Sequence, residues 1–329
     1  MLAYDDIGIV VIGRNEGKRL ISCLVSVKAE TNKIVYVDSG STDDSVLAAE
    51  RIGVSVTRLD LTLPFTAARA RNDGFGAIKR LWPYVNYVQF IDGDCELVHG
   101  WLEAALAFMK QEQSIAIVCG RRRERHPEQS VYNRLCDLEW DTPVGETTAC
   151  GGDSLIRVSA FEMVGGYQPQ LIAGEEPELC VRLRENGWKI WRLNAEMTRH
   201  DAAMIHFSQW WIRAVRSGCG YAQVAWLHRG SQFGIWRKDT RAAIFWGAVV
   251  PAVTILGAIV HPAFAGVALV YPLQICRMAF ARKPNNIESW ISALFIMLAQ
   301  FAAFRGILRF CWSRWRRRTV GLIEYKQAG

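Results

Sequence analysis

The chain has 329 residues, 50% of them hydrophobic and 22% charged, which allows one large α/β domain with a sizeable core and a smaller second part. The net charge of +7 is uneven: residues 1–204 hold 23 Lys and Arg against 29 Asp and Glu, whereas residues 205–329 hold 16 against 3 and eight of the 13 tryptophans. Nine scattered cysteines without a C-x-x-C pair argue against a disulfide framework or a zinc site and favour a reducing compartment.

Apolar runs and helical patterns alternate through the first 119 residues. The expected strands are residues 8–13, 34–37, 54–59, 87–91 and 115–119. The expected helices are residues 18–28, 46–52, 67–79 and 101–110. Strands that are apolar along nearly their whole length and alternate with helices indicate an α/β fold, in which helices cover both faces of a mostly parallel sheet.

Polar side chains follow three of these strands. They are Asn15 and Glu16 after the first strand, Asp38 and Ser39 after the second, and Asp92 and Asp94 after the fourth. The carboxyl ends of parallel strands share one edge of a sheet, and ligands of open α/β sheets bind there. We therefore expect these side chains to line a nucleotide site.

Asp92 and Asp94 are separated by one glycine at the end of an apolar run. Two carboxylates so close repel each other unless a cation lies between them. Hard oxygen ligands favour Mg²⁺ or Mn²⁺, which in turn bridge the phosphates of a nucleotide. An Asp-Gly turn beside a solvated acid explains this pattern equally well when it is taken alone.

The neighbouring motifs favour the metal site. They are V-I-G-R-N-E, V-D-S-G-S-T-D-D-S, A-R-A-R-N and F-I-D-G-D, in this order. With them, the stretch from about Ile7 to His200 resembles the family 2 glycosyltransferases, which have the Rossmann-like GT-A fold. The resemblance implies a membrane-attached, inverting enzyme that uses a nucleotide-diphosphate sugar and a divalent cation.

The resemblance also implies a role for each polar residue. Glu16 and Asp38 match positions that contact the base and ribose, and Arg71 matches a position that contacts the nucleotide. Asp92 matches the ribose-side member of the D-x-D pair, and Asp94 matches the metal ligand. Two alternatives remain: Asp38 as a helix cap only, and Arg71 as a solvated helix residue.

Residues 121–125 form a basic cluster, Arg-Arg-Arg-Glu-Arg, after the expected strand 115–119. A run of charges usually marks a solvated face. The alternative is contact with phosphate groups of the donor or the acceptor.

A second group of candidate residues follows residue 150. The resemblance implies that the small-residue turn at Gly152 lets the backbone approach the donor sugar and that Asp153 can bond a sugar hydroxyl. The segment G-E-E-P-E-L-C-V-R-L resembles the family motif G-E-D-x-D-L-x-x-R-L, whose first Asp is the catalytic base. Glu176 holds that position, and Glu175 precedes it as an expected substrate contact. Alternatively, these acids only complement a helix N-terminus.

His200 follows an expected edge strand at Lys189–Arg192. In some GT-A enzymes a histidine at this point completes the metal shell begun by the second Asp of D-x-D, here Asp94. Asp201 can serve instead, or can orient the imidazole as a second-shell residue. A structural, hydrogen-bonded histidine is the simpler alternative.

Three apolar runs occupy residues 242–260, 263–281 and 289–308. The first has no charged residue and spans roughly 28 Å as a helix, enough to cross a bilayer. Basic residues belong on the cytoplasmic side, which predicts a hairpin of the first two runs, with the third lying in the cytoplasmic leaflet. A buried hairpin in a soluble domain is the alternative.

These features divide the chain into three parts: a catalytic domain (1–205), an amphipathic interfacial segment (206–241), and membrane-associated helices with a basic tail (242–329). Residues 1–30 lack a basic stretch followed by an apolar one, so we expect no secretory signal and a catalytic domain that faces the cytoplasm from the cytoplasmic membrane. The apolar runs favour a membrane, and not nucleic acid, as the partner of the basic, Trp-rich part.

The sequence thus predicts a membrane-associated, metal-dependent, inverting glycosyltransferase of the hexosyltransferase type. It moves a sugar from a nucleotide-diphosphate sugar to an acceptor hydroxyl, and the membrane helices favour a lipid-linked acceptor in surface polysaccharide or glycolipid synthesis. The alternatives are a membrane adaptor with a degenerate nucleotide site and a sugar nucleotidyltransferase, which shares the fold.

Overall fold

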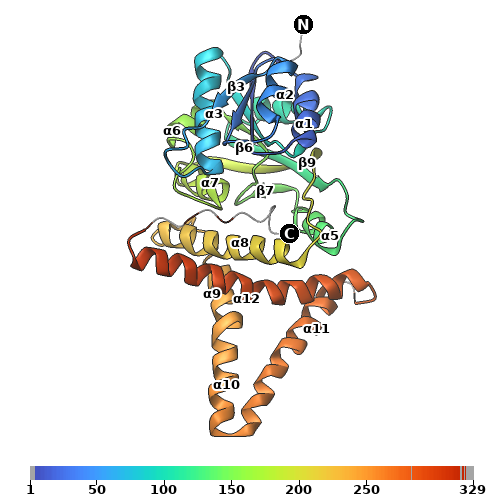
Figure 1. Ribbon diagram of the computed structural model, residues 1–329, viewed down its shortest axis with the longest axis vertical. Helices are drawn as coiled ribbons and strands as arrows, with labels where there is room; N and C mark the ends of the chain where they lie inside the picture. Colours follow the sequence, from blue (N-terminus) through green and yellow to red (C-terminus); the bar gives the residue numbers. More distant parts are fainter. Residues whose placement is uncertain (1–3, 283, 319–320, 322, 324–329) are drawn as a thin grey trace. The chain divides into compact units, whose positions relative to one another are not determined.

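The computed structural model describes residues 4–282, 284–318, 321 and 323. The chain divides into two compact units, Met1–Ile205 and His206–Gly329 (Figure 1). The first unit contains a mixed β-sheet with helices on both faces, and the elements described in the second unit are all helices. The predicted α/β fold with long apolar C-terminal helices is therefore confirmed.

One sheet organises the first unit. In sheet order, the described strands are β3 (Ser55–Arg58), β2 (Ile34–Asp38), β1 (Ile7–Gly13), β4 (Tyr87–Asp92), β8 (Ser154–Arg157), β6 (Ile115–Glu124), β9 (Lys189–His200) and β5 (Cys95–Leu97), and β7 (Gly145–Thr147) pairs with β9. Strands β1 to β4 run parallel, as do β6 and β9. Strand β8, which the sequence pattern does not predict, runs antiparallel between β4 and β6.

Helices cover both faces of this sheet. They are α1 (Lys18–Lys28), α2 (Ser45–Ile52), α3 (Ala67–Leu81), α4 (Trp101–Gln111), α5 (Val131–Glu139), α6 (Val158–Met163) and α7 (Glu175–Glu185). Successive strand side chains point to opposite faces, so Val11 of β1 joins a core cluster with Leu24 of α1. Its neighbour Val10 joins a second cluster with Ile78 of α3. The near-continuous apolar strands are thus buried on both sides.

The carboxyl ends of β1, β2 and β4 lie at one edge of the sheet. Gly13 is in register with Asp38, and Ile12 with Asp92. This register follows from parallel pairing of strands of similar length, and it brings the loops that follow these strands together, as expected for an open α/β sheet.

Strands β6 and β9 extend the same edge. Both are longer than expected: β6 continues through the basic cluster to Glu124, and β9 runs to His200. The prediction that Lys189–Arg192 lies at the edge of the sheet is wrong. These residues belong to β9, which pairs with β6 on one side and with β5 and β7 on the other. His200 is consequently in register with both Glu124 and Cys95.

The second unit contains two long helices in close contact, α8 (Phe207–Leu227) and α12 (Ile287–Trp315). A Cβ added to Gly218 of α8 would lie 2.1 Å from the carbonyl oxygen of Ala303, and one added to Gly306 of α12 would lie 2.1 Å from that of Val215. Glycine at these two positions lets the helix backbones touch, as in tightly packed membrane helices.

A helical hairpin occupies the segment between them. Its first arm runs through α9 (Arg237–Ile244), a π-helical turn (Phe245–Val249) and α10 (Val250–Val260), and its second through a 3₁₀ stretch (Pro262–Leu269) and α11 (Val270–Arg282). The π-helical turn comes directly before Pro251. Proline lacks an N–H and crowds the carbonyl four residues earlier, and the widened turn accommodates this.

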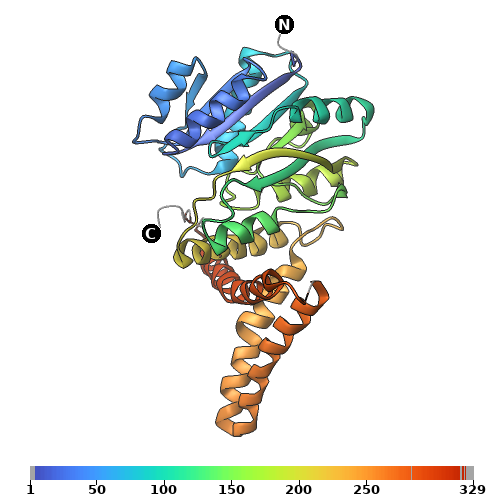
Figure 2. The ribbon, with the colours of Figure 1, turned by 90° about the vertical axis from the view of Figure 1, so that its right-hand side faces the viewer.

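Both arms of the hairpin, and α12, are long and apolar enough to cross a membrane by length and composition. Near the hairpin tip, Ile259 and Val260 are 77% and 83% exposed. Helix α12 lies across the hairpin instead of beside it (Figures 1 and 2). It also continues to Trp315, beyond the expected end at residue 308, because its arginines do not interrupt a helix.

Candidate functional site

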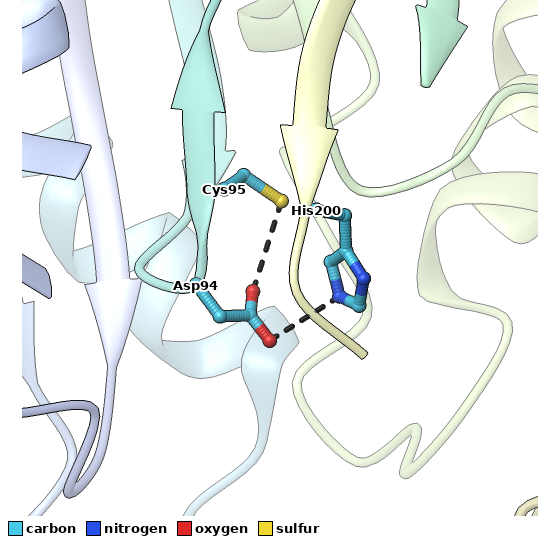
Figure 3. Close-up of side chains that lie close together, drawn as sticks. All are labelled: Asp94, Cys95 and His200. Atoms are coloured by element: carbon cyan, nitrogen blue, oxygen red, sulfur yellow. Dashed lines mark hydrogen bonds and ion pairs between the residues drawn. The ribbon is translucent and has the colours of Figure 1, made fainter. Parts of the chain in front are cut away.

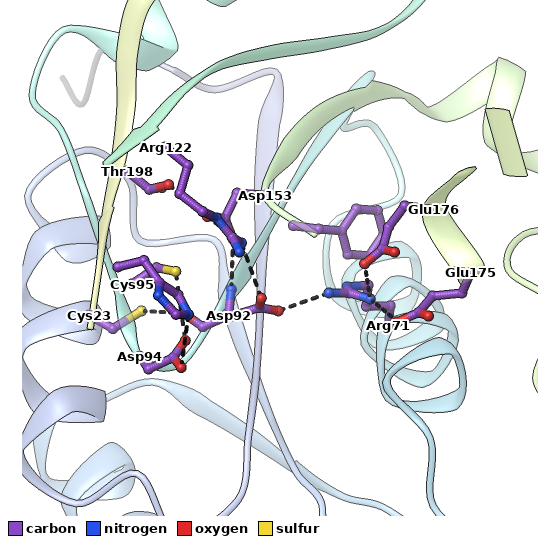
Figure 4. A network of polar contacts seen from close by, with 12 residues as sticks. Cys23, Arg71, Asp92, Asp94, Cys95, Arg122, Asp153, Glu175, Glu176 and Thr198 are labelled. Carbon is purple, nitrogen blue, oxygen red and sulfur yellow. Dashed lines mark hydrogen bonds and ion pairs between the residues drawn. The ribbon is translucent and has the colours of Figure 1, made fainter. Parts of the chain in front are cut away.

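A buried arginine joins three carboxylates at the end of β4 (Figure 4). Arg71 of α3 donates from Nη2 to Oδ1 of Asp92 (2.8 Å) and from Nη1 to Oε1 of Glu175 (2.9 Å). The same Nη1 lies 2.8 Å from Oε1 of Glu176. Burial opposes the charge of Arg71, but the three carboxylates outweigh it and raise the pKa of the guanidinium well above its ordinary value. Arg71 is therefore the centre of a buried ion-pair network and not a solvated helix residue.

A second arginine holds Asp92 from the other side. Arg122 of β6 donates from Nη2 to Oδ2 of Asp92 (3.2 Å) and from Nε to Oδ2 of Asp153 (2.9 Å). Burial raises the pKa of Asp92, but Arg71 and Arg122 outweigh it and hold that pKa below its ordinary value. Asp92 thus stays ionised, with its two oxygens facing two different arginines.

Asp153 lies behind Asp92. Its Oδ1 accepts the backbone N–H of Asp92 (3.1 Å), and its Oδ2 accepts the hydroxyl of Thr198 (2.6 Å) in addition to Arg122. The Asp153 side chain is fully buried. In this arrangement it orients Asp92, and the bond to a sugar hydroxyl expected from the sequence requires these contacts to rearrange.

The basic cluster is only partly solvated: Arg121 is buried and Arg122 is half-buried, whereas Arg123 and Arg125 are exposed. Its arginines pair with acids as follows: Arg121 with Asp137, Arg122 with Asp153, Arg123 with Glu196, and Arg125 with Glu96. The cluster is neutralised within the first unit, and only Arg122 reaches the D-x-D carboxylates.

Gly152 lies against this network. A Cβ at this position would lie 2.5 Å from Nη2 of Arg71, 3.0 Å from Oδ2 of Asp92 and 3.2 Å from Oε1 of Glu176. No side chain fits there without displacing the guanidinium. This close contact explains why position 152 requires glycine, which the sequence alone did not show.

Gly152→Ala should therefore disturb the site. Overpacking of this kind costs about 1–3 kcal/mol, and a shift of Arg71 should lower kcat/KM by roughly tenfold or more, since each 1.4 kcal/mol is about a factor of ten. The matched control is Gly151→Ala, because nothing lies within 4 Å of a Cβ at Gly151. Equal activity of the two variants in steady-state assays would contradict the prediction.

Glu175 and Glu176 open helix α7. Gly174 precedes them with φ 82°, in the left-handed region that favours glycine, and this turn aims both acids at Arg71. Glu175 is buried, whereas the Glu176 side chain is 12% exposed. Burial and the neighbouring Glu175 raise the pKa of Glu176 to about 7, against the opposing effect of Arg71. A carboxylate with such a pKa can accept a proton near neutral pH.

A second cluster lies at the ends of β4, β5 and β9 (Figure 3). Oδ2 of Asp94 lies 3.2 Å from Nε2 of His200, and Sγ of Cys95 lies 3.7 Å from Oδ1 of Asp94. One potential ligand atom from each residue lies within 4.8 Å of the others. Asp94 and His200 are thus brought together as the sequence predicts, and Cys95 is added.

The donor set fits a divalent cation of the Mn²⁺ type. Asp94 supplies a hard carboxylate and His200 an imidazole, and phosphate oxygens can complete such a shell. Burial raises the pKa of Cys95 well above its ordinary value, so the thiol stays protonated and is a poor ligand. Asp201 donates its backbone N–H to the carbonyl of Asp94 (3.1 Å), but its carboxylate is not in this cluster of the described residues.

The two residues expected to contact the base and ribose lie nearby. Asp38 accepts the hydroxyl of Tyr36 and the backbone N–H groups of Gly40 and Ser41, each at 3.0 Å. It therefore stabilises the turn after β2 and does not cap helix α2. Cγ of Glu16 would lie 3.5 Å from a Cβ at the D-x-D glycine, which places Glu16 beside that motif.

Sequence reasoning did not single out Arg122 and Cys95, nor Glu124, which is in register with His200. Arg122 and Glu124 were hidden inside the basic cluster, where the one acid among four arginines was the available signal. Cys95 is adjacent to D-x-D but carries no metal-binding spacing.

Part of the chain matches a known protein family, and the chain is similar to several known proteins. The family described as Glycosyl transferase family 2 matches residues 8–163, so Glu176 and His200 lie beyond the matched range. The chain is similar to a pre-mycofactocin glycosyltransferase of Mycobacterium tuberculosis, with 25% identity over 244 residues, 69% of this chain and 49% of that protein. It is also similar to an O-antigen chain rhamnosyltransferase of Salmonella typhimurium, with 23% identity over 248 residues, 65% and 76% of the two chains.

Among solved structures, the fold is similar to that of a mannosyltransferase from Pyrobaculum calidifontis in complex with GDP-Man and Mn²⁺. The TM-score is 0.64 at 16% identity, and the match covers 94% of this chain and 88% of that one. At this identity the similarity establishes the fold alone. The chain spans about half the length of the mycobacterial relative.

Proposed function

We propose that this chain, whose residues 8–163 match glycosyl transferase family 2, transfers a sugar from a nucleotide-diphosphate sugar to an acceptor hydroxyl with inversion. The observation that carries this proposal is the arrangement around Asp92. Asp94 and the candidate base Glu176 lie on opposite sides of Asp92 (Figure 4). Asp94 faces His200, and the two form a candidate cation site.

The chemistry follows from these residues. Glu176 removes the proton of the acceptor hydroxyl as the hydroxyl oxygen attacks the anomeric carbon, and the bond to the diphosphate breaks on the opposite face. Arg71 orients Glu176 and keeps Asp92 in place. A divalent cation bound by Asp94 and His200 would offset the charge that develops on the leaving diphosphate. Glu16 and Asp38 would contact the base and ribose of the donor.

The second unit supports a membrane location. Its exposed apolar hairpin favours attachment to the cytoplasmic membrane, with the first unit facing the cytoplasm. An enzyme held there meets lipid-linked acceptors, such as intermediates of a surface polysaccharide or glycolipid. This acceptor class rests on location and not on a residue that recognises the acceptor.

The direct test is a screen of nucleotide-diphosphate sugars for Mn²⁺-dependent thermal stabilisation of the detergent-solubilised protein. A ligand at a hundred times its Kd stabilises by about 2.7 kcal/mol, which shifts the unfolding midpoint measurably. With the matching donor and no acceptor, slow release of free sugar together with nucleoside diphosphate is expected. A nucleotidyltransferase or an inactive adaptor would not release both. Absence of any stabilising donor would contradict the proposal.

Charges on the hairpin should weaken membrane attachment. Val253 and Leu273, one on each arm, are 43% and 66% exposed. Arginine near the centre of a membrane helix costs about 2.5–3.5 kcal/mol, so Val253→Arg with Leu273→Arg should move much of the protein out of the floating liposome fraction. Leu47→Arg with Leu138→Arg is the matched control, because these leucines are similarly exposed in the first unit. A double hairpin variant that still floats completely would show that the attachment lies elsewhere.

A further inference from the structure

A second carboxylate, that of Glu124, lies beside the imidazole of His200, in addition to that of Asp94. Glu124 is in register with His200 on the neighbouring strand, and its Oε2 lies 3.7 Å from Nδ1 of the ring. The other ring nitrogen, Nε2, faces Asp94. Within the described part of the chain, Nδ1 is buried and has no hydrogen-bond partner. The imidazole is thus held between two acids, of which only Asp94 belongs to the proposed cation site.

Backbone hydrogen bonds hold the Glu124 carboxylate in this position. Its Oε1 accepts the backbone N–H of His126 (3.1 Å), and its Oε2 accepts that of Ala202 (3.1 Å), so both the loop after β6 and the loop after β9 fix it. The side chain is fully buried. Asp92, Glu175 and Asp153 pair with arginines, but among the described residues Glu124 forms no ion pair with Lys or Arg.

The chemistry of a metal-bound histidine explains why a buried carboxylate faces the second ring nitrogen of His200. A cation takes the lone pair of one ring nitrogen, so the other nitrogen must carry the proton and needs an acceptor. If Nε2 of His200 binds the cation, the proton lies on Nδ1, which faces Glu124. Trp140 packs on the ring in a T-shaped arrangement (centroids 4.8 Å apart). A small tilt of the imidazole would close the 3.7 Å gap to Glu124.

We propose that Glu124 is a positioning residue that accepts the Nδ1–H of His200 and thereby presents Nε2 to the divalent cation. This inference rests on the proposed metal-dependent function and adds a residue that determines cation affinity without touching the cation. Loss of an outer partner of a metal ligand typically weakens metal binding by about 10–100-fold.

The test measures binding of Mn²⁺ to the detergent-solubilised full chain by the EPR signal of free Mn²⁺, first alone and then with UDP or GDP present. Glu124→Gln should weaken Mn²⁺ binding by about 10–100-fold, because one amide oxygen cannot replace two carboxylate oxygens. Asp137→Asn is the matched control: Asp137 accepts the backbone N–H of Glu124 (2.9 Å) and so supports the same strand end without facing the imidazole. It should change the affinity less than about twofold.

A second measurement needs no variant. In ¹⁵N-histidine NMR of the Mg²⁺-loaded wild-type protein, His200 should show a protonated Nδ1 and a ligated Nε2. The opposite tautomer would overturn the inference even if Glu124→Gln fails to fold. If the wild type binds Mn²⁺ and Glu124→Gln binds it equally well, or Asp137→Asn weakens binding as much, only the role of Glu124 is refuted. A wild type that binds no Mn²⁺ under any of these conditions refutes the metal site itself.

Discussion

Asp94→Asn should abolish divalent-cation dependence and lower turnover by on the order of 10²–10⁴, because a catalytic metal contributes several kcal/mol of charge stabilisation. Asparagine keeps the shape of Asp94, and its carbonyl oxygen can still accept a hydrogen bond from Nε2 of His200, 3.2 Å from Oδ2 in the wild type. The substitution therefore removes a charge from the candidate cation site with little change of packing. Activity is followed as release of nucleoside diphosphate over a series of Mn²⁺ concentrations.

The controls distinguish the loss of a metal ligand from the loss of a carboxylate elsewhere in the first unit. Glu196→Gln removes a half-exposed carboxylate of β9 that pairs with Arg123, and it should leave the Mn²⁺ dependence unchanged. Thermal unfolding of Asp94→Asn without metal should resemble that of the wild type. If Asp94→Asn retains wild-type turnover in EDTA, the metal assignment is wrong.

The parallel part of the sheet was predictable because its signal is local. Strands β1, β2 and β4 are apolar along nearly their whole length, so each can be recognised from its own five to seven residues. The polar residues that follow them then fall at one edge by the geometry of parallel strands. Asp92 and Asp94 could be placed there from the sequence for this reason.

The ion-pair network was not predictable in the same way. Arg71 and Glu175 are 104 residues apart in the chain, and Arg122 and Asp153 are 31 apart. No local periodicity links such partners, and a run of arginines such as 121–125 by itself favours solvent. Arg71 and Arg122 can lie inside the protein because the fold brings carboxylates to both of them.

Strand β8 was missed for a related reason. Its four residues, Ser154–Arg157, are too few for a periodic signal, and the antiparallel insertion between two parallel sections depends on the whole sheet. This strand carries Asp153 to the backbone of Asp92. The sequence therefore predicted the small-residue turn at Gly152 but not strand β8, which follows the turn and fixes its position.

Glu176→Gln should lower turnover by on the order of 10²–10⁴, the usual cost of losing a general base, while donor affinity changes little. Gln has the same length, and Arg71 keeps two other carboxylates, Asp92 and Glu175. Glu176→Asp restores the residue typical of the resembling family but withdraws the carboxylate by one methylene, so intermediate activity is expected. Turnover is measured at saturating donor, and donor affinity by titration.

Glu175→Gln is the matched control for Glu176→Gln, because both acids face the same nitrogen of Arg71 and both lie in the first turn of α7. If the acids only complemented the helix N-terminus, the two substitutions would lower activity alike.

The pH profile of turnover distinguishes the roles of Glu175 and Glu176 further. Because the pKa of Glu176 is raised to about 7, wild-type turnover should rise as the pH increases through that value and the base loses its proton. Glu175→Gln removes a neighbouring negative charge, which should lower the pKa of Glu176 and move the rise to lower pH. Glu176→Gln should show no such rise. Near-normal turnover of Glu176→Gln together with an inactive Glu175→Gln would assign the base to Glu175 instead.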